Sequence, residues 1–352
     1  MSKVLMKGNE AIGEAAIRAG AKNFFAYPIT PQTEVSEYLV RRMPDVGGVF
    51  LQMESEIGAA NALFGAASSG ERVFTTSSSP GIALMSEAIS YLTAANLPVV
   101  IVNVCRAGPG LGGILPSQGD YLMMTRGLGH GDFKAMVFAP ASVQESVELM
   151  MLAFELADKY RNPAMLMADG MIGQMMEPVD FDNVLKPNPP DKSEWSTTGA
   201  KGRKPHLVRT LFLDPNEGEI ENRKRAVKYT EIEANERRWE LVNLDEPRDL
   251  VLCAFGTVAR VCKTAIERLK EEGIEVGLFR PISLWPFPFP ELKKVAENTE
   301  MFLSVEMSNG QMIEDIRFAL EGKKPVHFYG RQGGIVPAPE EVVTECKKLL
   351  GK

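Results

Sequence analysis

The chain has 352 residues, of which 45% are hydrophobic and 24% charged, and its net charge is −7. This length suits two domains joined by a linker. The acidic balance argues against nucleic acid as a partner, because phosphate binding needs a basic face. No run approaches the roughly 18 apolar residues that span a bilayer, and residues 1–8 lack the apolar core of a signal peptide. We therefore expect a cytoplasmic protein with no membrane partner.

The first predicted domain, residues 1–186, alternates short apolar strands with helical segments. This alternation predicts an α/β fold in which right-handed crossovers form an open parallel sheet, covered by helices on both faces. Helices often begin after Ser, Thr, Asn or Asp, and proline is favoured in the first turn. The expected strands are 23–26, 49–53, 73–77, 99–104, 136–139 and 164–168, and the expected helix caps are Asn9, Thr30 followed by Pro31, Ser55 and Ser142.

A connecting segment, residues 187–248, begins with a proline-rich run. Its first part is polar and basic, which is typical of an extended connection over the surface. The charged stretch from Asp214 to about Leu244 predicts a solvated helix laid over a neighbouring domain, with Asp214 and Pro215 at its start. Its thin apolar stripe would consist of Ile220, Val227, Ile232 and Trp239.

Residues 249–352 repeat the alternation on a smaller scale and predict a second α/β domain. The turns at 255–257 and 330–334 could hold an anion, although glycines at strand ends more often make tight turns. The expected strands are 250–254, 276–279, 301–305 and 326–329, and the expected helices are 257–272, 291–297, 311–320 and 340–350.

The cysteines and histidines predict no metal site on this chain. Cys105, Cys253, Cys262 and Cys346 are scattered without a C-x-x-C pair, and the three histidines lack metal-ligand spacing. We therefore expect buried free thiols rather than ligands of an iron–sulfur cluster.

Two segments, Tyr27–Pro31 and Met53–Ala60, lie where a predicted strand hands over to a helix. This rim of an open parallel sheet is where such folds bind their ligands. Glu56 falls at the start of the second helix, whose N-terminus favours an ionised carboxylate. A carboxylate there could bind a heterocyclic nitrogen, and Glu54 at the end of the preceding strand is the competing candidate.

The run Gly108–Gly113 matches G-x-G-x-x-G and follows a predicted strand. A dinucleotide site needs a helix to begin within this motif, whereas Pro109 and Pro116 bracket a segment that is typical of a loop. A mobile loop that closes over a ligand is therefore favoured over a nicotinamide or flavin site.

Four segments in order, Tyr27–Pro31, Glu54–Ala60, Cys105–Gly110 and Ala168–Gly170, resemble the alpha-type subunit of thiamine-diphosphate-dependent 2-oxoacid:ferredoxin oxidoreductases. The resemblance extends over nearly the whole chain. It implies that the first domain is similar to the pyrimidine-binding domain of thiamine enzymes. It also implies that the last domain is similar to the C-terminal domain of transketolase.

The resemblance implies a role for each residue at the rim. Glu56 would bind the pyrimidine N1′ of thiamine diphosphate and drive the tautomerisation of the cofactor, with Pro28 and Ile29 also at the cofactor. Arg106 would bind the substrate carboxylate in bidentate fashion. Thr30 would turn its hydroxyl toward cofactor and substrate.

A complete thiamine site also needs Mg²⁺ and a diphosphate cradle, usually Gly-Asp-Gly followed by Asn. Ala168–Gly170 comes nearest but lacks the first glycine. The resemblance therefore implies a beta-type partner that supplies the diphosphate and Mg²⁺ site, and gamma- or delta-type partners that carry iron–sulfur clusters. We expect one component of a hetero-oligomer, inactive alone, with an open rim around Thr30, Glu56 and Arg106.

The implied reaction is oxidative decarboxylation of a 2-oxoacid with coenzyme A to an acyl-CoA, with electrons passing to ferredoxin. The motifs favour 3-methyl-2-oxobutanoate. 2-Oxoglutarate is the alternative and would need a second cation, such as Arg126 or Lys134. The pairs Met123–Met124, Met150–Met151 and Met175–Met176 could line an apolar pocket, although core filling is more ordinary. A nicotinamide-dependent dehydrogenase and a non-catalytic thiamine-fold scaffold subunit are the remaining alternatives.

Overall fold

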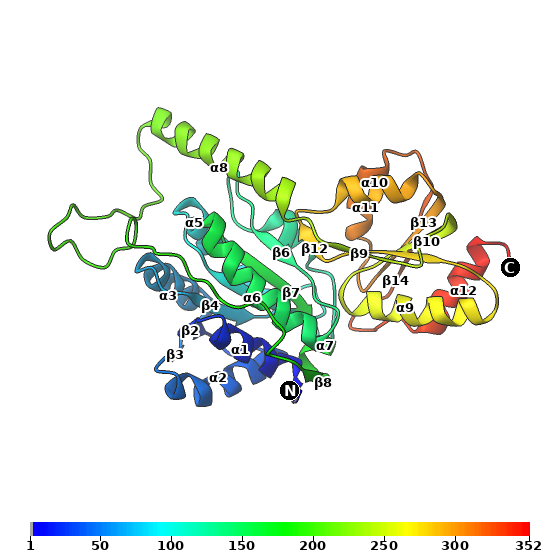
Figure 1. Cartoon of the computed structure of the whole chain (residues 1–352), viewed down its shortest axis with the longest axis horizontal. Coiled ribbons are helices and arrows are strands. Elements are labelled where there is room, and N and C mark those ends of the chain that lie inside the picture. Colours follow the sequence, from blue (N-terminus) through cyan, green and yellow to red (C-terminus); the bar gives the residue numbers. More distant parts are fainter. Residues whose placement is uncertain (1–2) are drawn as a thin grey trace.

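The computed structural model describes residues 3–352, so residues 1 and 2 of the opening segment lie outside the description. Two α/β units lie side by side, and an extended segment with the helix α8 reaches away from the first unit (Figure 1). Each unit is a mainly parallel sheet with helices packed on it, as the alternating pattern predicts. No helix within residues 3–352 has the length and apolar character needed to cross a membrane.

The first unit contains a seven-stranded sheet in the order β12-β6-β7-β5-β4-β2-β3. Strands β2 to β7 run parallel, and β12 joins the edge antiparallel to β6. The central strands β4, β5 and β7 are buried along their whole length, as expected for a parallel sheet covered on both faces. The strands are β2 (Asn23–Ala26), β3 (Val49–Gln52), β4 (Val73–Ser77), β5 (Val100–Cys105), β6 (Met136–Phe138), β7 (Ala164–Asp169) and β12 (Ser283–Trp285).

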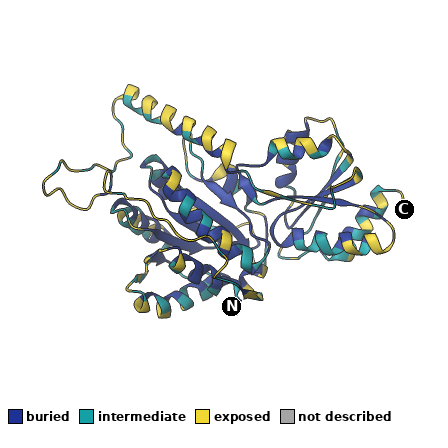
Figure 2. Ribbon diagram, viewed as in Figure 1, coloured by how far each residue is buried: buried dark blue, intermediate teal, exposed yellow. Residues whose placement is uncertain are grey.

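Helices on this sheet bury their small and aliphatic residues against it (Figure 2). Helix α1 packs against α2 and α6, whereas α3 packs against α5. A separate antiparallel pair, β1 (Val4–Lys7) and β8 (Met176–Val179), lies beside α1. The helices are α1 (Gly8–Arg18), α2 (Thr33–Asp45), α3 (Glu56–Ser68), α4 (Pro80–Leu84), α5 (Ser86–Ala94), α6 (Val143–Tyr160) and α7 (Gly170–Gln174), with a π-helical turn at Met123–Gly127.

Two of the predicted helix caps are confirmed. Ser55 accepts the N–H of Gly58 at 3.0 Å, and Ser142 accepts that of Glu145 at the same distance. Each hydroxyl therefore satisfies one of the free N–H groups in the first turn of its helix.

The other two expected caps in this domain are wrong. Asn9 lies inside α1, and its amide donates to Pro31 O at 2.7 Å and to Glu34 Oε2 at 2.9 Å. A tertiary contact thus replaces the local one. Thr30 lies in a turn closed by the N–H of Gln32 on Ile29 O, so α2 begins only at Thr33.

The connecting segment carries α8 (Pro215–Asn235), and Asp214 accepts the N–H of Asn216 at its start, as expected. The predicted apolar stripe is largely wrong, because Ile220 and Val227 are exposed and Trp239 lies beyond the helix in β9. The buried face consists of Arg225, Tyr229 and Ile232, and most of the remaining surface of α8 is exposed (Figure 2).

The second unit is a five-stranded sheet in the order β14-β13-β10-β11-β9. Strand β9 comes from the connecting segment, and β12 from the second unit completes the first sheet. The predicted boundary at residue 249 is therefore crossed twice: β9 precedes it but joins the second sheet, and β12 follows it but joins the first sheet. The elements of the second unit are β9 (Trp239–Val242), β10 (Arg248–Cys253), β11 (Gly277–Pro281), β13 (Thr299–Glu306), β14 (Val326–Gly330), α9 (Gly256–Glu271), α10 (Phe289–Ala296), α11 (Met312–Leu320) and α12 (Pro339–Leu349).

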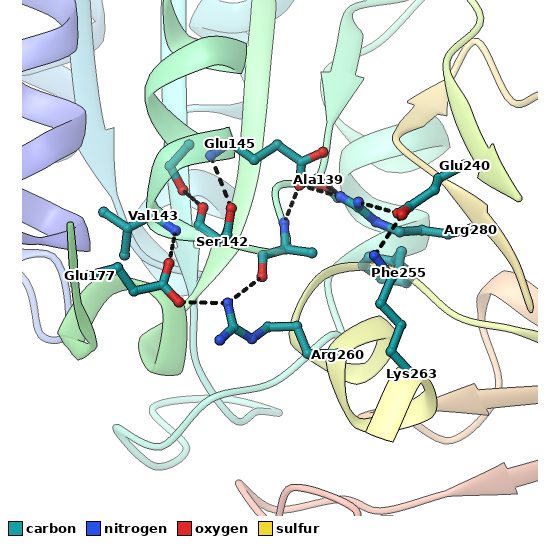
Figure 3. Close-up of polar contacts among 12 residues, drawn as sticks. Ala139, Ser142, Val143, Glu145, Glu177, Glu240, Phe255, Arg260, Lys263 and Arg280 are labelled. Atoms are coloured by element: carbon teal, nitrogen blue, oxygen red, sulfur yellow. Dashed lines mark hydrogen bonds and ion pairs between the residues drawn. The ribbon is translucent and has the colours of Figure 1, made fainter. Parts of the chain in front are cut away.

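An ionic network joins the two units (Figure 3). Arg280, which is buried, bonds to Glu145 of α6 and to Glu240 of β9, the latter at 2.8 Å. Arg260 of α9 bonds to Glu177 at 2.8 Å. Removing one partner of a buried pair leaves an uncompensated charge, so this network specifies how the units meet.

A loop of the first unit also docks on the second. The backbone N–H of Gln118 donates to Met307 O at 2.9 Å, and the N–H of Met307 donates to Gln118 Oε1 at 3.0 Å. The side-chain amide of Gln118 also donates to Phe255 O at 2.8 Å. Tyr121, which is fully buried, donates its hydroxyl to Asp315 at 2.6 Å. The loop that leads away from the rim is therefore fixed at its far end.

Candidate active site

The predicted rim residues lie at the carboxyl ends of strands of one sheet: Thr30 follows β2, Glu56 follows β3 and Arg106 follows β5. Glu56 is the first residue of α3 and is only 6% exposed. Its carboxylate makes no hydrogen bond to any of residues 3–352, and Oε1 lies beside Gly81 at the start of α4. Neither oxygen is among the fully buried side-chain atoms of residues 3–352 that lack a partner, so the carboxylate keeps some contact with solvent and is available to a ligand.

Glu54, the competing acid, has a different environment. It is exposed, and its carboxylate lies against Gly58 on the first turn of α3, where Oε1 accepts the Ser55 hydroxyl at 3.1 Å. Solvent and the helix N-terminus satisfy this charge. The geometry therefore favours Glu56 over Glu54 as the acid that faces a ligand.

Arg106 follows β5 and is also only 6% exposed. Its Nη1 donates to Thr30 O at 3.0 Å and its Nη2 to Leu111 O at 2.9 Å, while the buried Nε has no partner among the described residues. The structure thus brings Thr30 and Arg106 together. The expected open rim holds for Thr30, which is exposed, and is wrong for Glu56 and Arg106, which are covered by α4 and the glycine loop.

The glycine loop, residues 107–115, folds over Arg106. Its N–H and C=O groups pair across its base, with Gly113 N bonding to Ala107 O at 2.9 Å. Gly112 has φ +59°, and a Cβ there would overlap Ala107 O, so glycine is required. No helix begins within the motif, and the expected loop is confirmed in place of a dinucleotide fold.

A polar network that the sequence reasoning missed holds the backbone of Arg106. Ser79 Oγ donates to Asp120 at 2.6 Å and accepts the N–H of Arg106 at 3.0 Å. Asn103 accepts the N–H of Ser79 and donates to Asp120, both at 2.9 Å. Ser79 has φ +20°, a strained conformation of the kind that gathers at functional sites. The run of hydroxyl residues from Thr75 to Ser79, directly before Pro80 and Gly81, was the available signal.

Two hydrogen bonds of the Gln32 side chain fix the turn that contains Pro28 and Ile29 to strand β4. Thr76 Oγ1 donates to Gln32 Oε1 at 2.6 Å, and Gln32 donates to Tyr27 O at 3.2 Å. Pro28 and Ile29 are partly buried beside this turn. The turn is therefore tied to β4, next to the strand end that leads to Gly81.

Other predicted candidates lie elsewhere. Arg126 pairs with Asp315 and Glu314 of the second unit, and Lys134 lies 6.0 Å from the ring centroid of Trp285. Of the methionine pairs, Met124, Met150 and Met151 are buried in the hydrophobic core, in agreement with core filling. Burial raises the pKa of Cys105 well above its usual value, so this thiol is neutral beside Arg106. No group of three His, Cys, Asp or Glu side chains within residues 3–352 could hold a metal.

Asp169, from the nearest approach to Gly-Asp-Gly, serves as a cap in this structure. It is buried, and Oδ1 accepts the N–H groups of Met171 and Ile172 at 2.9 and 3.1 Å. Its other oxygen, Oδ2, lies close to Gly256 at the start of α9. One of the turns considered for an anion is thus next to a carboxylate of the protein itself.

The substitution Asp169→Asn is expected to change how stability depends on pH. Burial raises the pKa of Asp169 above its ordinary 3.8, so its folded form holds a proton that the unfolded form has lost. Protonated Asp169 favours the folded state, so its contribution to the stability of the wild type is present at low pH and is lost as pH rises from 3.8 through the raised pKa. The amide keeps the cap without ionising, so the variant should gain stability relative to wild type over that window. Urea unfolding at several pH values measures the difference, and a constant difference would contradict it.

The two α/β units share their fold with a solved transketolase. A solved split-gene transketolase, described as an inactive beta4 tetramer, matches with a TM-score of 0.60 at 15% identity, over 98% of each chain. This likeness shows the fold class alone.

The family is shown by sequence. Residues 14–240 match the family described as pyruvate flavodoxin/ferredoxin oxidoreductase, thiamine diphosphate-binding, and residues 248–342 match pyruvate:ferredoxin oxidoreductase core domain II. The chain belongs to this family and is an oxidoreductase subunit of the 2-oxoacid:ferredoxin type, which confirms the resemblance stated from its motifs.

Individual relatives span the same length. VorB of Methanothermobacter thermautotrophicus, a ketoisovalerate oxidoreductase subunit, is 45% identical over 100% of this chain and 99% of its own. KorA of the same organism, a 2-oxoglutarate synthase subunit, is 33% identical over 98% of each. The solved 2-oxoglutarate:ferredoxin oxidoreductase from Magnetococcus marinus, with 2-oxoglutarate, coenzyme A and succinyl-CoA bound, matches with a TM-score of 0.89 at 26% identity. It covers 99% of this chain, which spans 65% of that one.

Proposed function

We propose that this chain is the alpha-type subunit of an enzyme that oxidatively decarboxylates 3-methyl-2-oxobutanoate with coenzyme A. The products are the acyl-CoA and carbon dioxide, and the electrons pass to ferredoxin. The observation that carries the proposal is the rim itself. There the acid Glu56 has no partner among residues 3–352, and it lies at the same edge of the sheet as Arg106, which bonds to Thr30. The identity to the ketoisovalerate oxidoreductase subunit supports the branched substrate.

The residues at the rim fit thiamine diphosphate. Glu56 is buried, has no partner among residues 3–352, and lies beside Gly81, which has no side chain to block it. When bound, thiamine diphosphate supplies the centre that accepts the electron pair left when a 2-oxoacid loses carbon dioxide. Glu56 would exchange a proton with a ring nitrogen of the pyrimidine, and its position at a helix N-terminus favours the ionised form that remains after donation. Pro28 and Ile29 would contact the same ring.

Arg106 would bind the carboxylate of the substrate. Each terminal nitrogen of its guanidinium keeps one N–H beyond the bonds to Thr30 O and Leu111 O. Two such donors fit a carboxylate in bidentate geometry. Thr30, exposed at the same turn, has a hydroxyl free for the substrate. The bond to Leu111 also links substrate binding to the glycine loop.

A beta-type subunit would complete the site with the diphosphate cradle and Mg²⁺, since Asp169 is committed to caps. Large apolar side chains are exposed on the segments that carry the rim, which supports a partner there; they are Tyr27, Ile57, Leu84, Leu111, Ile114 and Leu115. Iron–sulfur clusters would belong to gamma- or delta-type subunits, because all four cysteines of this chain are buried and unpaired.

The alternative substrate is 2-oxoglutarate, favoured by the KorA relative and the Magnetococcus marinus structure. Its distal carboxylate would need a further cation. Arg126 and Lys134, the candidates from sequence, are committed to Asp315 and to Trp285. This observation favours the branched substrate.

The test is to purify the chain with its co-expressed partners and assay reduction of ferredoxin with each 2-oxoacid and coenzyme A. We expect kcat/KM for 3-methyl-2-oxobutanoate to exceed that for 2-oxoglutarate by at least about 100-fold, because a pocket without a second cation leaves the distal carboxylate unpaired. The purified complex should contain thiamine and iron, and this chain purified alone should show no turnover. Preference for 2-oxoglutarate would select the alternative, and turnover by the chain alone would contradict the shared site.

A further inference from the structure

The end of β4 carries buried hydroxyls that no described residue binds. Ser77 and Ser78 are both fully buried, and Oγ of each has no hydrogen-bond partner within residues 3–352. A buried donor without a partner costs free energy, and such groups are uncommon in folded proteins. Ser77 is the last residue of β4 and Ser78 follows it, and only the Ser77 hydroxyl is among the three atoms nearest to a Cβ built on Gly81.

Gly81 shows what lies near Ser77. A Cβ built on Gly81 would overlap Ser77 Oγ, and it would lie 2.7 Å from Glu56 Oε1 and 3.0 Å from Glu56 Cγ. The hydroxyl and the carboxylate therefore occupy the space that any side chain at this position would fill. Gly81 has an ordinary helical conformation in α4, so its lack of a side chain matters for space rather than for backbone freedom.

The pair is complementary in chemistry. The Ser77 hydroxyl is a donor without an acceptor, and the Glu56 carboxylate beside it is an acceptor to which no residue among 3–352 donates. A hydroxyl hydrogen rotates freely about its C–O bond. Asn103, which pairs with Ser77 across the sheet, is already bonded to Ser79 and Asp120.

We propose that Ser77 is a positioning residue for Glu56, and that Gly81 provides the space in which the two meet. In the loaded site the Ser77 hydroxyl, which has no partner among residues 3–352 in this structure, would donate to the Glu56 carboxylate and orient its second oxygen toward the ring nitrogen of the cofactor. The inference rests on the proposed role of Glu56. It adds a residue at the end of β4, outside the helix that carries Glu56, whose function at the site is to orient that acid.

The experiment uses the purified complex with thiamine diphosphate and Mg²⁺, and four variants of this chain. Ser77→Ala removes the hydroxyl, and Gly81→Ala fills the shared space. Ser78→Ala is the matched control, since it removes an equally buried and equally unpartnered hydroxyl from the next residue. Glu56→Gln reports on the acid itself. Two quantities are measured without turnover: the rate of hydrogen–deuterium exchange at the reactive carbon of the bound cofactor, and the dissociation constant of the cofactor.

We expect Ser77→Ala to slow the exchange by roughly 10- to 100-fold, the loss that follows when a catalytic group is misplaced by about 1 Å. Gly81→Ala should slow it at least as much. In both variants the dissociation constant should change less than about threefold, because positioning acts on the acid and the diphosphate still anchors the cofactor. Ser78→Ala should match wild type in both quantities and in melting temperature.

The outcomes separate this inference from the proposed function. Exchange that is slow in Glu56→Gln but normal in Ser77→Ala would overturn the role of Ser77 and leave Glu56 in place. Equal slowing in Ser77→Ala and Ser78→Ala would also overturn it, because the effect would then follow from strand packing. Normal exchange in Glu56→Gln would overturn the proposed function.

Discussion

Glu56→Gln is expected to abolish most of the decarboxylation by the assembled complex. Glutamine has the same shape and keeps an acceptor, but it cannot hold and return a proton at the pyrimidine nitrogen. General acid–base groups of this kind contribute roughly 10²- to 10⁴-fold, so kcat should fall by that factor. The measurement is the initial rate of ferredoxin reduction at saturating 2-oxoacid and coenzyme A.

Glu54→Gln is the matched control for this result. Glu54 is two residues away, is exposed, and its carboxylate lies against the first turn of the same helix. Its charge interacts with the helix N-terminus, so its loss should cost stability of at most about 1 kcal/mol with kcat unchanged. If Glu54→Gln lost activity and Glu56→Gln kept it, the assignment of the two acids would have to be reversed.

Arg106→Gln is expected to raise KM for the 2-oxoacid while leaving KM for coenzyme A nearly unchanged. The substitution removes a buried charge that we assign to the substrate carboxylate, a loss of about 2–5 kcal/mol or roughly 30-fold or more in affinity. It also removes the donor to Leu111 O. Backbone amides of the glycine loop should therefore exchange with deuterium faster than in wild type, which a peptide-level exchange experiment can measure.

Arg126→Gln is the control with the same chemical change. Arg126 pairs with Glu314 and Asp315 on the second unit, so this variant should keep both KM values and the preference between substrates. An unchanged KM for the 2-oxoacid in Arg106→Gln would contradict its role as the carboxylate ligand. A selective loss of 2-oxoglutarate turnover in Arg126→Gln would instead support the second-cation alternative.

Local signals predicted most elements of the fold. The strands at 23–26 and 73–77 have the expected bounds, because short apolar runs between polar turns are typical of parallel strands. Ser55 caps the helix that carries Glu56, as the residue type indicates. Asn9 and Thr30 have the same local signal, but tertiary contacts and a turn decide their conformations. β9 and β12 were missed because each forms only by pairing with a distant strand.

The sequence by itself determined the family and the placement of an acid at a helix start, because motif order and capping are local properties of the chain. Only the tertiary structure decided that Ser77 and Gly81 lie beside Glu56. Their proximity depends on the order β4-β2-β3, which places the end of the strand that carries Ser77 two positions from the strand that leads to Glu56, and hydrophobic periodicity does not encode that order. The same reason explains why the space beside Gly81 could not be inferred from its neighbours in the chain.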